Sequence, residues 1–253
     1  MPNLREQSPV RNRLLAALPS HEFEQLRPNL DLVHLPKGKI IYHAGENVRH
    51  GYFMNDGQVS LLSVTDEGTI EVAMVGNEGA IGLPIIWRKN QTSYEVMVQI
   101  AVRSAYRINA KALRNEFDRG GKFQDLLLRY TQVLVTQITQ SAVCNHFHSS
   151  TQRLARWLLI ANDLVKSNTF YLTHEFISHM LGAPRSGVST AAGTLQKSGL
   201  ITYSRGKITI FDRPGLEDAS CECYEVIRES FDHFLDAEET TNISPSRNTA
   251  GRR

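Results

Sequence analysis

Apolar and polar residues follow different patterns along different parts of this chain. Residues 9–30 place Leu, Ala and Phe at helical spacing, and Pro19 and Pro28 divide the stretch, which predicts short helices. From Leu32 to Ile108 the chain holds short runs of β-branched and aromatic residues separated by turn-forming residues. The runs are VHL, KIIYH, GYFM, QVSLLSV, IEVAMV, YEVMVQI and SAYRI. Their spacing predicts an antiparallel sandwich or barrel, in which QVSLLSV and IEVAMV form a hairpin around TDEGT.

A helical pattern returns near residue 122. No Gly or Pro occurs from Lys122 to Phe147, which predicts one amphipathic helix of roughly seven turns. Its apolar residues recur at steps of three or four: Phe123, Leu127, Tyr130, Leu134 and Ile138. We expect a second helix over Thr151–Lys166 and a further single helix over Gly215–Ala237. Residues 1–8 and the last fifteen or so residues are expected to be disordered.

Residues 172–212 have the pattern of a helix-turn-helix followed by a wing. Thr173 can cap the first helix, and Gly182 suits the tight turn because glycine tolerates positive φ. A second helix begins near Arg185, and Gly199 ends it. Its predicted buried face consists of Val188, Ala191 or Ala192, and Leu195. ITYSRGKITIF then predicts two strands around a basic turn at 204–207.

The other face of this second helix is small, polar and cationic, so it can enter a DNA groove about 12 Å wide. The Arg185 guanidinium can donate two hydrogen bonds, one to N7 and one to O6 of a guanine. Ser186 can reach a base or a phosphate, and Thr190 a thymine methyl or a phosphate. The predicted DNA-binding residues are Thr173, Arg185, Ser186, Ser189, Thr190, Lys197, Arg205 and Lys207. The alternative is a helical hairpin packed in a core, with these residues as ordinary polar surface.

Composition and charge change this picture only locally. Hydrophobic residues make up 41% and charged residues 21% of the chain, as in ordinary globular proteins. The net charge is +2, but residues 151–214 carry +5 and residues 215–253 carry −5. A local basic segment attracts phosphate, but on charge alone a solvated charged face is the favoured interpretation. No apolar run approaches the roughly 18 residues needed to span a bilayer. With no signal-peptide pattern and only three cysteines, we expect a cytoplasmic protein without membrane association.

The layout resembles the Crp/Fnr superfamily of bacterial regulators. The matching residues are Gly38, Gly45, Gly57, GNEGAIG (76–82) and LGAPRSGVSTAAGTLQKSGLI (181–201). The resemblance implies an α+β fold with an N-terminal antiparallel, jelly-roll-like β-roll, a long dimerisation helix and a C-terminal winged helix-turn-helix. The implied divisions are the roll with its N-terminal helices (1–121), the dimerisation helix (122–148), the DNA-binding domain with a C-terminal helix (149–237) and a disordered tail (238–253).

The resemblance also implies a function. Two copies of the chain would pair through the long helix and bind a palindromic operator in double-stranded DNA, regulating transcription. RNA polymerase and an unidentified small-molecule effector are further partners that the resemblance allows. The alternatives are a cyclic-nucleotide-binding regulatory protein and an adaptor that binds no DNA. We expect no enzyme, because the sequence has no nucleophile elbow, no phosphate-binding Gly-rich loop before a Lys and no plausible catalytic carboxylate pair.

The sequence departs from the family at the effector pocket. Family members that bind cyclic nucleotides use Gly-Glu for the ribose and an Arg followed by Ser or Thr for the phosphate. Here Leu83 and Pro84 follow Gly82, and QTSYEVMV (91–98) has no Arg. A buried phosphate without a cation is costly, so we predict that cyclic AMP is not bound. The candidate pocket residues are Gly82, Leu83, Arg88, Ser93 and Tyr94, with Arg88 as the substitute cation.

We predict no cofactor and no metal site. Fnr-type members bind an iron–sulfur cluster through N-terminal cysteines, but no Cys precedes Cys144 here. Cys144 and His148 share a helix face at i, i+4. On one helix, however, Cys221 and Cys223 would point roughly 200° apart, which is poor geometry for a shared metal.

Overall fold

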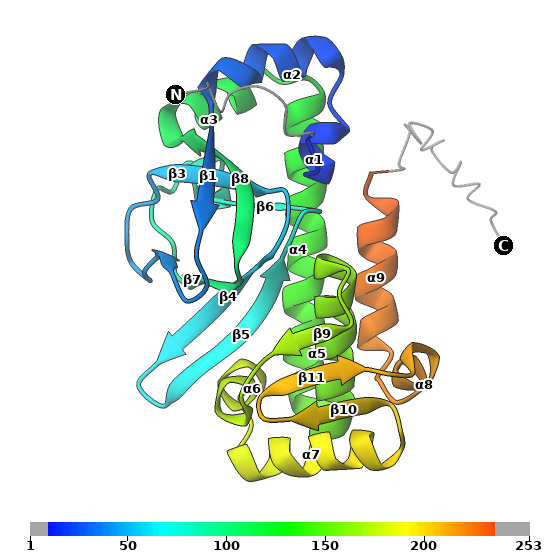
Figure 1. Cartoon of the computed structure of the whole chain (residues 1–253). Helices are drawn as coiled ribbons and strands as arrows, with labels where there is room; N and C mark the ends of the chain where they lie inside the picture. The colour runs from blue at the N-terminus through cyan, green and yellow to red at the C-terminus, as the bar shows by residue number, and fades with distance from the viewer. Residues whose placement is uncertain (1–9, 236–253) are drawn as a thin grey trace, which may run out of the picture.

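The computed structural model describes residues 10–235 (Figure 1). The predicted disorder at residues 1–8 and in the tail from 238 onward lies outside this range. The chain begins with short helices α1 (Arg13–Ala16) and α2 (Ser20–Leu26) and the 3-10 turn η1 (Arg27–Asn29), as the prolines predicted. Among the described residues no helix is long and apolar enough to cross a membrane.

An antiparallel β-roll of two four-stranded sheets follows. Its strand orders are β1-β8-β3-β6 and β2-β7-β4-β5. The elements are β1 (Leu30–Leu35), β2 (Ile40–Tyr42), β3 (His50–Met54), β4 (Gln58–Thr65), β5 (Gly68–Val75), β6 (Ala80–Ile81), the 3-10 turn η2 (Leu83–Ile85), β7 (Glu95–Ile100) and β8 (Val102–Asn109). The predicted hairpin is confirmed, because β4 pairs with β5 from Val59 opposite Val75 to Thr65 opposite Gly68.

Three helices connect the roll to the C-terminal part of the chain. They are α3 (Ala110–Asp118), α4 (Gly121–Phe147) and α5 (Ser150–Val165). The predicted stripe on α4 packs into the core of the roll, where Phe123, Leu127, Tyr130 and Leu134 are buried. Tyr130 lies so close to the β5–β6 turn that a Cβ on Gly79 would clash with its hydroxyl oxygen. The stripe therefore holds α4 on its own roll.

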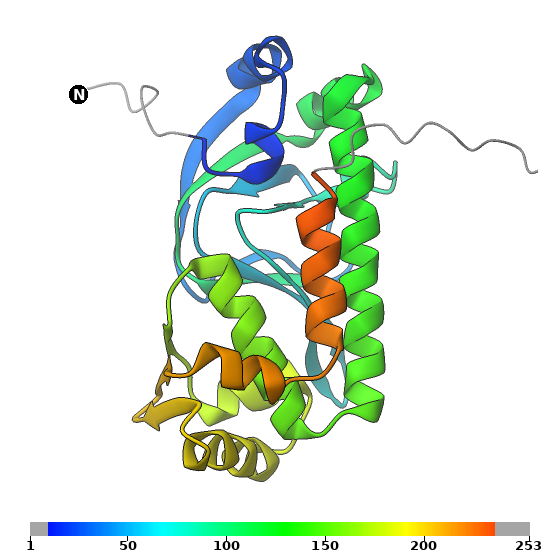
Figure 2. The ribbon, with the colours of Figure 1, turned by 90° about the vertical axis from the view of Figure 1, so that its right-hand side faces the viewer.

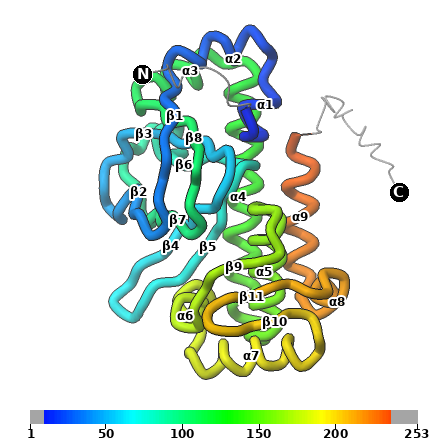
Figure 3. Tube along the Cα trace, in the orientation of Figure 1, coloured from blue at the N-terminus to red at the C-terminus, as the bar shows by residue number. Residues whose placement is uncertain are grey.

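The C-terminal part combines helices with a three-stranded sheet of order β10-β11-β9. Its elements are β9 (Thr169–Tyr171), α6 (His174–Leu181), α7 (Arg185–Lys197), β10 (Ile201–Ser204), β11 (Lys207–Ile210), α8 (Arg213–Asp218) and α9 (Cys223–His233). α9 runs beside α4, and α7 lies at the end of the molecule opposite α2 (Figures 1 and 3). Turned by 90°, the molecule has α4 along one side, with α9 next to it (Figure 2).

The single helix predicted over Gly215–Ala237 is wrong. The chain forms α8 and α9 with a break at 219–222 between them. The Ser220 hydroxyl donates to the carbonyl of Glu217 at 2.8 Å, which satisfies an acceptor at the end of α8. This break places Cys221 in a loop and Cys223 at the start of a new helix.

A second core lies under α5 and contacts the roll. Trp157 on α5 is 1% exposed and packs with residues of α6, α7 and the β4–β5 hairpin. Its indole Nε1 donates to the Glu71 carboxylate on β5 at 2.6 Å, and the Ser60 hydroxyl donates to the same carboxylate. The roll and α5 are thus joined by a buried hydrogen-bond network.

Candidate DNA interface

The first helix of the predicted motif begins and ends as the sequence indicated. The Thr173 side chain accepts from the backbone N–H of Phe176 at 3.2 Å and caps α6. Gly182 follows α6 with φ 55°, in the left-handed region that glycine adopts readily. A Cβ at Gly182 would lie 2.7 Å from Cδ1 of Ile70, because the β4–β5 hairpin packs against this turn.

α7 separates its buried residues from its exposed ones as predicted. Val188, Ala191, Ala192 and Leu195 are each at most 2% exposed and pack in the second core. The outward-facing residues Arg185, Ser186, Ser189, Thr190 and Lys197 are all exposed, as is Thr173 at the start of α6. The Thr190 hydroxyl donates to the carbonyl of Ser186 at 3.0 Å, which leaves its methyl group for apolar contact.

Ser189 is held by a contact that the sequence did not reveal. Its Oγ lies 2.9 Å from Nδ1 of His174, and the His174 ring stacks on Tyr203 of the wing. The two ring centroids are 4.4 Å apart and the planes differ by 12°. Burial lowers the pKa of His174, and the nearby Arg185 cation lowers it further, so both effects favour the neutral ring. No local sequence pattern signals this cross-element arrangement.

The wing is a tight hairpin. Ser204 pairs with Lys207, and the two residues between them have positive φ: 48° for Arg205 and 77° for Gly206. Such a two-residue loop with two positive φ values matches the twist of the flanking strands. Arg205 and Lys207 are both exposed at this turn. β9, which the sequence analysis did not predict, adds the third strand through Lys207 opposite Tyr171.

Among the described residues, the exposed cations of this surface have no acidic partners. Within residues 10–235, none of Arg185, Lys197, Arg205 and Lys207 forms an ion pair. Arg213, the first residue of α8, instead pairs with Asp163 at 2.8 Å and with Glu217 at 3.0 Å. Unpaired cations beside a protruding helix give a surface that can neutralise DNA phosphates.

The predicted effector-pocket residues differ in their exposure. Gly82 and Leu83 are buried in the roll, and Tyr94 is partly buried. Arg88 and Ser93 are exposed. The Arg88 guanidinium Nη2 lies 3.4 Å from Oδ1 of Asp118 on α3. The side chain of Arg88 is 73% exposed, so its charge is not placed in the interior of the roll.

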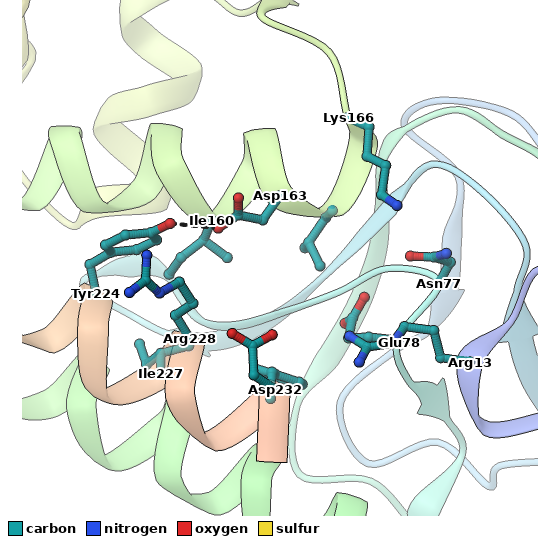
Figure 4. A pocket seen from close by; sticks show the side chains of 12 residues that line it. Arg13, Asn77, Glu78, Ile160, Asp163, Lys166, Tyr224, Ile227, Arg228 and Asp232 are labelled. Atoms are coloured by element: carbon teal, nitrogen blue, oxygen red, sulfur yellow. Dashed lines mark hydrogen bonds between the residues drawn. The ribbon is translucent and has the colours of Figure 1, made fainter. Parts of the chain in front are cut away.

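A pocket of about 340 Å³ lies elsewhere, between the roll, α5 and α9 (Figure 4). None of the five predicted effector residues lines it. Its charged and polar side chains come from all three parts: Arg13, Asn77, Glu78, Asp163, Lys166, Tyr224, Arg228 and Asp232. A small molecule in this pocket would contact the roll and the DNA-binding part of the chain together.

Two family models match the chain. The cyclic nucleotide-binding domain matches residues 32–119, and the Crp-like helix-turn-helix domain matches residues 152–219. Fold and surface thus define a regulator in which a roll of the nucleotide-binding type is joined to a DNA-binding head. The chain belongs to the Crp/Fnr family of DNA-binding transcription regulators, a family of regulators rather than enzymes.

Solved structures share this fold. A transcriptional regulator of the Crp/Fnr family from Eubacterium rectale matches with 23% identity and a TM-score of 0.64, covering 81% of this chain and 96% of that chain. FixK2 from Bradyrhizobium japonicum matches with 17% identity and a TM-score of 0.65. The match covers 76% of this chain and 98% of FixK2. CLP from Xanthomonas campestris matches with 13% identity and a TM-score of 0.62 and is described as a c-di-GMP-responsive global regulator. The match covers 76% of this chain and 99% of CLP. Comparison with curated proteins found no match.

Proposed function

We propose that this protein regulates transcription from the cytoplasm by binding a palindromic DNA site as a homodimer, with α7 of each copy in the major groove. The observation that carries the proposal is the division of α7 into two faces. Its outward face has exposed polar residues and unpaired cations, and its opposite, apolar face is fully buried. A helical hairpin built only for packing would not require cations on its exposed side. An adaptor that binds protein instead of DNA would show no salt-dependent affinity for duplex DNA.

Each residue has a role that follows from its chemistry. Arg185, at the first position of α7, donates two hydrogen bonds to one guanine. Ser186 and the Thr190 methyl group contact neighbouring bases. Phosphates are bound by the cations Lys197, Arg205 and Lys207 and by the hydroxyls of Thr173 and Ser189. Thr173 Oγ1 only accepts within the cap, so its hydroxyl hydrogen remains available to a phosphate. Ser189 has the same freedom when the Nδ1–H of neutral His174 donates to it.

Dimer formation is supported by a second apolar stripe on α4. The stripe of Leu128, Val135, Ile138 and Ala142 faces away from the roll, and all four residues are exposed in the single chain. Their spacing of seven, three and four residues matches the seam of a two-helix coiled coil. Of the stripe predicted from the sequence, Phe123, Leu127, Tyr130 and Leu134 are buried against the roll, whereas Ile138 is exposed and belongs to the second stripe. We therefore infer that the second stripe pairs with its counterpart in another copy.

The effector of this regulator is not cyclic AMP in the usual binding mode. A cyclic phosphate in the roll needs a buried cation, and the exposed Arg88 is already near Asp118. Calorimetric titration with cyclic AMP is expected to show no binding. A micromolar signal that the Arg88→Ala variant loses would contradict this part of the proposal.

Selection of bound duplexes from random DNA tests the function. We expect the recovered site to be a palindrome with half-sites about one helical turn apart, because two α7 helices related by a two-fold axis read the same sequence. Recovery of no enriched sequence, together with salt-independent affinity, would favour the adaptor. An enriched but asymmetric site would refute the homodimer and leave DNA binding standing.

A further inference from the structure

Three cysteines and a histidine from two distant segments meet where α4 ends. Cys144 lies in the last turn of α4, and His148 is the residue that follows the helix. Cys221 lies in the α8–α9 break and Cys223 begins α9. The three sulfur atoms and a ring nitrogen of His148 all lie within 4.8 Å of one another. The prediction of no metal site assumed that Cys221 and Cys223 lie on one helix, and this assumption is wrong.

We propose that Cys144, His148, Cys221 and Cys223 bind a single divalent metal ion in a tetrahedral site, with Zn²⁺ as the best match. Zinc bonds of about 2.3 Å to sulfur and 2.0–2.1 Å to nitrogen place tetrahedral ligand atoms roughly 3.3–3.8 Å apart. The Cys144 and Cys221 sulfurs are 3.5 Å apart, and the Cys223 sulfur is 3.5 Å from His148 Nδ1. A multi-iron cluster needs its cysteines farther apart, because they ligate different irons.

The surroundings fit a bound ion. His148 presents Nδ1 to the cysteines, while its Nε2 lies 3.2 Å from Glu222 Oε1. Metal-binding histidines typically donate their second N–H to such a carboxylate, which fixes the ring and its tautomer. The three cysteines are each at most 5% exposed and form a small cluster separate from the two main cores. Four protein ligands in a closed setting are typical of a structural metal site.

Two buried arginines, Arg153 and Arg156, offset the negative charge of this site. Three thiolates, a neutral imidazole and a divalent ion together carry one negative charge. Arg156 of α5 is 6% exposed, and its positive charge acts on both Cys144 and Cys223. Among the described residues, its Nε has no hydrogen-bond partner. The same positive charge also acts on the Glu71 carboxyl, and a metal–thiolate centre would give the buried guanidinium a second anionic neighbour.

The bound ion would connect the dimerisation helix to the DNA-binding part of the chain. Two of its ligands belong to the end of α4, and two belong to the α8–α9 connection that follows the wing. The site thereby adds a cross-link between α4 and α9, which already pack side by side (Figure 2). Metal loss is expected to lower the thermal midpoint, because a ligand that binds only the folded chain stabilises it.

Metal analysis of the full-length, reduced protein tests the proposal. We expect one Zn²⁺ per chain after dialysis. After chelation, refilling with Co²⁺ should give one ion per chain with thiolate charge-transfer absorption and the intense visible bands of tetrahedral Co²⁺. A chain that binds neither ion, or binds Co²⁺ with an octahedral spectrum, would overturn the proposal. So would acid-labile sulfide with iron, or a Cys144–Cys221 disulfide as the only product.

Variants locate the ligands. Cys144→Ser and Cys223→Ser should each lower Zn²⁺ affinity by more than the roughly 10- to 100-fold that loss of an outer-shell partner costs, and Glu222→Gln should fall within that range. His148→Cys keeps four ligands and should still bind one ion, which separates lost coordination from lost folding. His146→Ala removes an exposed neighbour on α4 and should change nothing. Unchanged affinity in the Cys→Ser variants would refute the assignment. These measurements use no DNA, so their failure is distinct from failure of the proposed function.

Discussion

Single buried residues connect the two halves of this molecule, and Glu71 is the clearest example. Its carboxylate lies on the roll, is 8% exposed and accepts from Trp157 of the DNA-binding part. Burial raises the pKa of Glu71 from 4.5 to about 7, although the Ser60 and Trp157 hydrogen bonds act in the opposite direction. The folded chain thus binds this proton more tightly than the unfolded chain does.

We predict that stability falls as the pH rises from about 4.5 to about 7, because a raised pKa stabilises the fold only while the group stays protonated. This contribution is worth at most about 3 kcal/mol. Glu71→Gln should flatten the dependence, as measured by urea unfolding across pH. Burial raises the pKa of Glu78 to about 7 as well, so part of the slope should remain. The exposed Glu67→Gln is the control, and an equal flattening there would contradict the account.

His174 acts at the same scale within the DNA surface. It contacts Ser189 and stacks on Tyr203, so it holds α7 and the wing in register. His174→Ala should weaken binding to the selected duplex by about 1 kcal/mol, with an unchanged salt slope because no phosphate cation is lost. His179→Ala removes an exposed histidine from the same helix and should have no effect. Equal losses in both variants would show that the stacking is irrelevant to DNA binding.

At the scale of elements, the turn between α6 and α7 depends on glycine. Gly182 has φ 55°, and a Cβ there would meet Ile70 at 2.7 Å, whereas a Cβ on Gly193 in the middle of α7 would meet nothing within 4 Å. Gly182→Ala should therefore destabilise the fold by about 1–2 kcal/mol, while Gly193→Ala should stabilise it by up to about 1 kcal/mol. Chemical unfolding measures both. Changes of the same sign would contradict the turn geometry.

The elements also show how far sequence patterns reach. The long strands, the hairpin and the α6–α7 motif were predictable because each carries its own apolar period or turn residues. β6 and β9 have only two and three residues and exist because longer strands pair with them. The break at 219–222 has neither Gly nor Pro, so the cysteine and histidine cluster remained hidden. The outward face of α7 was predictable, but the Ser189–His174–Tyr203 contact was not, since it depends on tertiary packing.

The whole molecule is incomplete as a single chain on this account. Leu128 is 51% and Val135 is 55% exposed on the outer face of α4. We predict that Val135→Glu converts the dimer to a monomer in sedimentation experiments, because like charges would meet across the seam. Val64→Glu is the matched control, since Val64 is 49% exposed and lies opposite Thr69 near the turn of the β4–β5 hairpin. A wild-type chain that sediments as a monomer would refute the pairing.

The role of Arg185 provides the most direct test of the account. The measurement is the affinity of Arg185→Ala for the selected palindrome and for random duplex DNA at several salt concentrations, beside Lys197→Ala. We predict that Arg185→Ala loses roughly 1–3 kcal/mol on the palindrome, with relaxed preference at one base pair per half-site. Lys197→Ala should weaken both DNAs alike and reduce the salt slope. Equal losses on both DNAs for Arg185→Ala, or no loss at all, would contradict base reading by α7.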